Sequence, residues 1–121
     1  MKKKVQFTPI EYPQINSYIH YFIERDIEIA NKVLASKGCE YEARGSGATY
    51  WKAGKDPIVW LSSKRIDIVV HEMYHAVAYM LRDIGLEHTK ETEEIYVYFT
   101  EYAIKQVLKR LVKKFTTACK R

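Results

Sequence analysis

The chain has 121 residues, of which 47% are hydrophobic and 29% are charged, the size and balance of one globular domain. This composition excludes an intrinsically disordered chain, and no apolar run approaches the roughly 20 residues of a membrane-spanning helix. The net charge is +5, and the positive excess lies at the end of the chain, where position 105 onward holds basic but no acidic residues. We expect one domain over residues 1–121, with a polar lead-in at 1–12 and a basic tail at 115–121.

The start of the chain and its cysteines indicate the compartment. Lysines follow Met1, but the hydrophobic segment that a secretion signal needs does not follow them. Two cysteines in different segments are too few for a disulfide scaffold. We therefore expect a cytoplasmic protein without a membrane segment.

The first predicted element is a helix. Apolar residues from Ile15 to Leu34 recur with a helical period, Pro13 suits a first turn, and Gly38 suits a helix stop. The pattern predicts a helix over about 14–37.

Three short strands are predicted next. Turn-forming clusters at 45–47 and 54–57 separate segments rich in aromatic and β-branched residues. These segments, at 40–44, 48–53 and 57–62, predict a small antiparallel three-stranded sheet.

Two further helices complete the predicted order. One runs from about Ser63 to Ile84, with Gly85 as its stop, and the next opens at Thr89 or Thr92 and runs to about Lys114. The fold class is therefore α+β: an N-terminal helix, a small sheet, and two consecutive helices.

The first of these two helices contains the motif His71-Glu72-Met73-Tyr74-His75, which has the pattern HExxH. Residues four apart on a helix share a face, so both imidazoles can bind one zinc ion (Zn2+). Glu72 can then act as the general base on a metal-bound water. The alternative is a pair of histidines on a helix surface with no ligand.

A catalytic zinc usually has a third protein ligand. The acidic opening of the next helix is the best source, because that helix must return beside the first one. Helical position favours Glu94, with Glu91 and Glu93 behind it, and His88 is a further candidate. The third ligand thus stays open among these four residues.

The segment HEMYHA, followed on the next predicted helix by EEIYVYFTEY, resembles the minimal gluzincin-type zincins. The resemblance covers about residues 57–103 and extends distantly to the ImmA/IrrE-type peptidases. Short proteins of this kind occur in bacteriophages and mobile elements, which would place this one in a host cytoplasm. The resemblance implies a zinc metallopeptidase with His71, His75 and Glu94 as ligands and Glu72 as base.

The same resemblance implies that an edge strand binds the protein or peptide substrate by strand addition, and the segments 48–53 and 58–62 are the candidates. Two other functions are consistent with the sequence. One is a non-catalytic binding module of this fold, for example a phage-encoded inhibitor of a host protein. The other is a nucleic-acid accessory protein that uses the basic tail, although no nucleic-acid-binding motif is present.

Overall fold

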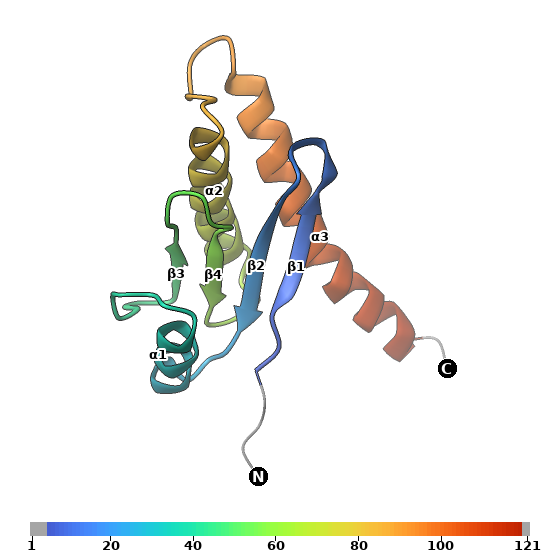
Figure 1. Cartoon of the computed structure of the whole chain (residues 1–121). Coiled ribbons are helices and arrows are strands. Elements are labelled where there is room, and N and C mark those ends of the chain that lie inside the picture. The colour runs from blue at the N-terminus through green and yellow to red at the C-terminus, as the bar shows by residue number, and fades with distance from the viewer. Residues whose placement is uncertain (1–4, 120–121) are drawn as a thin grey trace.

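The computed structural model describes the backbone of residues 5–119 and the side chains of residues 5–109. Within this part, a four-stranded sheet packs with three helices (Figure 1), so the α+β prediction is confirmed. The strands are β1 (Thr8–Tyr12), β2 (Ser17–Ile23), β3 (Gly47–Tyr50) and β4 (Ile58–Leu61). The helices are α1 (Ile27–Ser36), α2 (Ile66–Asp83) and α3 (Glu93–Cys119).

The N-terminal region differs most from the sequence prediction. Residues expected in the first half of a helix form β2, and part of the expected polar lead-in forms β1, which pairs with β2 in antiparallel register. Asn16 adopts a left-handed conformation (φ 50°) in the tight connection between them. The apolar positions of this segment fit a strand period of two residues as well as a helix period of 3.6 residues. The segment forms a strand because it pairs with β1 and β4.

Helix α1 is therefore shorter than the predicted 14–37. Its N-cap is Asp26, whose carboxylate accepts hydrogen bonds from the backbone N–H groups of Glu28 (2.9 Å) and Ile29 (3.3 Å). The predicted stop is confirmed, because Gly38 has φ +84° just beyond the end of the helix.

The sheet has the order β1-β2-β4-β3, in which β2 and β4 are parallel and the other pairs are antiparallel. The predicted three-stranded antiparallel sheet is thus corrected to a mixed sheet of four strands. The expected strand at 40–44 is absent, because Asn31 of α1 accepts a hydrogen bond from the Ala43 N–H (2.6 Å) and holds this segment as a loop.

The two faces of the sheet have separate cores. Helices α2 and α3 cover one face, which buries Ile19, Tyr21, Val59 and Leu61 against residues such as Met73. Helix α1 packs on the opposite face, where Phe22 and Trp60 contact Ala30 and Leu34.

The last two helices follow the sequence prediction. Helix α2 lies within the predicted 63–84, with Gly85 at φ +85° after it, and α3 begins directly after Thr92. No helix in the described part of the chain is long and apolar enough to cross a membrane. The side chains beyond residue 109 lie outside the described residues. They include the side chains of the predicted basic tail at 115–121.

Candidate metal-binding and catalytic site

Helix α2 brings His71 and His75 together. Their ring centroids lie 4.8 Å apart, with the ring planes at 72°. His71 is exposed and His75 is partly buried, and neither imidazole makes a hydrogen bond or ion pair with another described residue. Both rings are therefore available to a ligand from the solvent side.

The spacing of these rings fits zinc. Two imidazoles bound tetrahedrally, with Zn–N distances of about 2.1 Å, place their ring centroids about 5 Å apart. The 4.8 Å separation matches this value. The spacing of the pair is thus compatible with two of the three protein donors of a catalytic zinc site.

Glu72 is held by the edge strand β3. Its side chain is only 8% exposed, and the Thr49 hydroxyl lies 2.8 Å from Glu72 Oε1 and 3.0 Å from the Glu72 carbonyl oxygen. Oε2 accepts no hydrogen bond from a described residue, yet it is not sealed from solvent. One carboxylate oxygen is therefore anchored while the other remains open to a water molecule.

Gly47 makes room for this carboxylate. A Cβ at position 47 would lie 2.9 Å from Glu72 Cγ and 3.1 Å from Glu72 Oε2. A side chain at this position would therefore have to displace Glu72. The start of β3 must be glycine for the strand to approach α2 this closely.

A hollow of about 470 Å³ opens between β3 and the first half of α2. His71 and Glu72 line it from the helix, and Ser46 and Gly47 line it from the strand. At its rim Arg65 makes a bidentate ion pair with Asp67 (2.8 and 3.1 Å). Asp67 therefore bonds Arg65 and does not orient His71.

Aromatic rings continue the histidine face toward the end of β3. Tyr79 stacks on His75 with centroids 6.2 Å apart, and Trp51 stacks on Tyr79 at 5.4 Å. Trp51 is 42% exposed, whereas Trp60 is buried in the core on the α1 side of the sheet. The rings border the site on the side of the α2 C-terminus.

The structure does not bring the predicted third ligand to the histidine pair. No three His, Cys, Asp or Glu side chains in the described part of the chain converge closely enough to hold a metal ion. Glu94 is exposed and lies about 200° around α3 from the buried Tyr96. Glu91 and Glu93 are exposed as well.

The connection between the helices explains this placement. The first turns of α3 lie at the C-terminal end of α2, because the Tyr96 hydroxyl donates to the Leu86 carbonyl (2.5 Å). His75 lies eight residues, or about 12 Å, before that end. His88 packs edge-on against Tyr96 (4.5 Å between centroids) and is held at the same end.

The chain matches no family model, and neither the curated proteins nor the solved structures include a match.

Sequence reasoning missed Gly47 and Thr49. The cluster Gly45-Ser46-Gly47 indicates a turn, but Gly47 already belongs to β3. A glycine at the start of a strand next to a predicted catalytic helix is the signal that could have identified the close approach.

Proposed function

We propose that this protein is a zinc-dependent metallopeptidase-like hydrolase related to the gluzincin-type zincins. The observation that carries the proposal is the joint placement of two unpaired imidazoles and a strand-anchored, buried glutamate on consecutive turns of α2. His71 and His75 would hold the zinc, but the described residues bring no third ligand to them, because Glu94 lies at the far end of α2. A bound zinc lowers the pKa of its water toward 7 and polarises a scissile carbonyl.

The chain's own residues supply the proton transfer. Glu72 takes a proton on Oε2 and delivers it to the leaving amine, as a general base and then a general acid. Thr49 keeps Oε1 in place throughout, so that Oε2 has one orientation toward the open side of the site. This anchoring reduces the reorganisation that a flexible glutamate would need.

Strand β3 is the surface that we propose for the substrate backbone. Of the two predicted segments, 58–62 is excluded, because β4 is paired on both sides, with β2 and with β3. Strand β3 is at the sheet edge and borders the hollow that contains His71 and Glu72. An extended peptide added to this edge would run beside Glu72.

Zinc content tests the proposal. Elemental analysis of protein purified without added metal or a histidine tag should find about one zinc per chain, the stoichiometry of a mononuclear site. His71→Ala should lose this zinc, whereas the control His20→Ala, on β2, should keep it. The absence of zinc in the purified protein, together with no uptake on titration, would overturn the proposal.

The same measurement identifies the third ligand. The sequence predicts Glu94 in this role, and loss of most of the zinc affinity in Glu94→Ala would show that Glu94 reaches the histidines when zinc is bound. Retention of zinc in Glu94→Ala, with loss in the Glu91 or His88 alanine variant, would assign the ligand to that residue instead.

A further inference from the structure

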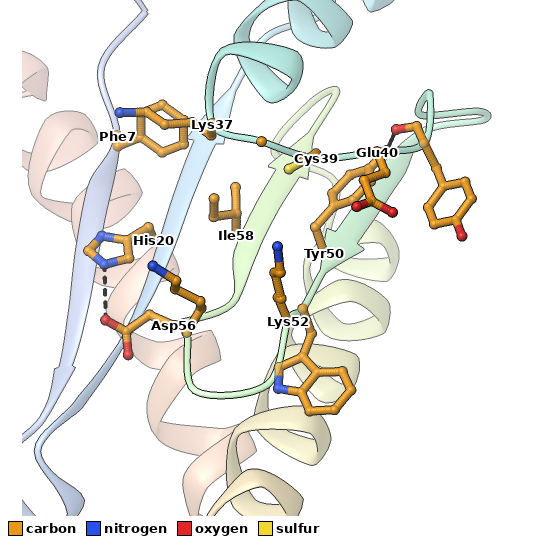
Figure 2. Close-up of a pocket in the computed structure, with 13 residues that line it drawn as sticks. Phe7, His20, Lys37, Cys39, Glu40, Tyr50, Lys52, Asp56 and Ile58 are labelled. Carbon is orange, nitrogen blue, oxygen red and sulfur yellow. Dashed lines mark hydrogen bonds and ion pairs between the residues drawn. The ribbon is translucent and has the colours of Figure 1, made fainter.

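A second hollow lies on the opposite face of the sheet from α2. Helix α1 covers Phe22 and Trp60 on this face, but it has only ten residues. The remaining surface, around His20 and Ile58, forms a hollow of about 650 Å³ (Figure 2). This volume is within the range of about 300–1,000 Å³ that small-molecule sites occupy.

The floor and walls of this hollow are largely apolar and aromatic. Ile58 of β4 lies at the floor, between Phe7 on one side and Tyr50 on the other (Figure 2). Trp51 also lines it. The Tyr50 hydroxyl donates to the Tyr41 carbonyl (2.8 Å) and joins the adjacent loop to β3.

Positive charges surround this apolar surface. Lys37, Lys52 and Lys55 line the hollow, together with Glu40 and Asp56. Lys37 lies over the Phe7 ring, 5.1 Å from its centroid. Lys52 and Lys55 form no ion pair with any residue whose side chain the structure describes, and Lys52 Nζ points into the hollow in Figure 2.

Neither Glu40 nor Asp56 forms an ion pair with Lys52 or Lys55. Asp56 Oδ2 lies 3.5 Å from His20 Nε2, and Asp56 Oδ1 accepts a hydrogen bond from the Tyr18 N–H (3.2 Å). Glu40 has no ion pair with a described side chain, and it follows Cys39 on the far side of the hollow from Asp56 (Figure 2). The β3–β4 loop therefore presents two ammonium groups that have no ion-pair partner among the described side chains, in a hollow lined by three lysines and two carboxylates.

This loop is fixed in place before any ligand binds. The Gly54 N–H contacts both carboxylate oxygens of Asp83 on α2 (3.2 Å each), and Asp56 attaches the other end of the loop to β2. A binding surface that is already ordered loses little conformational entropy when a ligand binds.

We propose that this hollow binds a small aromatic anion, a flat ring system that carries a phosphate or a carboxylate. The ring lies against Ile58 and Tyr50, and the anionic group is held by Lys52 and Lys55. Trp51 borders both this hollow and the aromatic rings beside His75, but His71, Glu72 and His75 do not line the hollow, so the proposal does not depend on the metallopeptidase function.

Binding of three naphthalene compounds tests this inference: 1-naphthyl phosphate, 1-naphthoate and the neutral 1-naphthol, each followed by calorimetry with the full chain. The two anions should bind more tightly than 1-naphthol, and the tighter of the two identifies the preferred anionic group. The double variant Lys52→Gln/Lys55→Gln should weaken the anions about fivefold and leave 1-naphthol unchanged, because exposed charge pairs are individually weak. The control Lys32→Gln/Lys90→Gln removes the same charge from residues outside the hollow and should change nothing.

Cys39 reports where the compounds bind. Its sulfur faces the hollow (Figure 2). Because burial raises the pKa of its thiol, alkylation is measured near pH 9. The Cys119→Ser background removes the other cysteine of the chain. A bound anion should slow alkylation of Cys39. Equal affinity for the anions and 1-naphthol, equal affinity in the lysine variant, or no protection of Cys39 would each overturn the proposal.

Discussion

The two faces of the sheet are covered very differently. Helices α2 and α3 pack on one face and bury a continuous core, whereas the ten-residue α1 covers only part of the other face. On the well-covered side, Glu72 and the histidine pair lie where α2 borders the edge of the sheet. On the other face, the uncovered area forms the hollow of about 650 Å³.

This difference places the proposed chemistry and the proposed ligand binding in different surroundings. A glutamate base needs burial and a fixed orientation, which contact between a long helix and an edge strand provides. A small-molecule pocket needs a concave apolar surface with a few polar groups, which a short helix leaves behind. Substitutions on one face should therefore leave the function of the other unchanged.

The largest effect is expected for Glu72→Gln. If Glu72 is the general base, cleavage of a peptide mixture, followed by mass spectrometry, should slow by about 10²- to 10⁴-fold. Zinc content and binding of 1-naphthyl phosphate should be unchanged, because the amide has nearly the same shape and the hollow is on the other face. Cleavage at the wild-type rate would remove Glu72 from the mechanism.

A smaller effect is expected for Gly47→Ala. The added Cβ would lie 2.9 Å from Glu72 Cγ, and the resulting overpacking should lower the free energy of unfolding by about 1–3 kcal/mol. The control Ser46→Ala, one residue earlier, should change it by less than about 0.5 kcal/mol. Urea unfolding measures both, and equal stability of the two variants would contradict the close approach of β3 to α2.

Thr49→Val tests the hydrogen bond without changing the shape of the side chain. Glu72 as a residue is 8% exposed, and its carboxylate loses the side-chain donor that Thr49 provides, so the expected cost is about 1–3 kcal/mol. Thr49→Ser keeps the hydroxyl and should restore the peptidase activity that valine lowers. If serine and valine behave alike in urea unfolding and in activity, the hydroxyl does not position Glu72.

The mildest expected effect is a change in pH dependence at Tyr12. Burial raises the pKa of the Tyr12 hydroxyl above its ordinary value of 10, and the hydroxyl donates to the Phe99 carbonyl (2.5 Å). The unfolded chain ionises this phenol near pH 10 while the folded chain keeps it neutral. The stability from Tyr12 is therefore fully present below pH 10 and is lost as the pH rises above that value.

Tyr12→Phe removes this dependence. Urea unfolding should show a cost of about 1 kcal/mol at neutral pH and a smaller difference from wild type above pH 10. Tyr41→Phe, at a residue that is 76% exposed, should keep the wild-type pH profile. A constant difference between Tyr12→Phe and wild type from pH 7 to 11 would contradict a raised pKa.

Local signals predicted the C-terminal half of the fold well and the N-terminal half poorly. Over α2 the apolar stripe keeps a helical period for five turns and is followed by Gly85. An apolar stripe of this length does not fit the alternating pattern of a strand. Over residues 14–23 the apolar positions suit both a helix and a strand. Residues 17–23 form a strand because β1 and β4 pair with them on either side. The pairing partners come from distant parts of the chain, so no local sequence pattern specifies them.

The sequence by itself determined the α+β class, the helix with HExxH, and the shared face of His71 and His75, because helical spacing is a local property. Only the tertiary structure decided that β3 anchors Glu72, that the opening of α3 lies at the far end of α2, and that α1 leaves a hollow uncovered. The hydrogen bond between Thr49 and Glu72, for example, joins residues that are 23 positions apart. Contacts of that kind depend on how elements pack, and neither residue spacing nor composition specifies them.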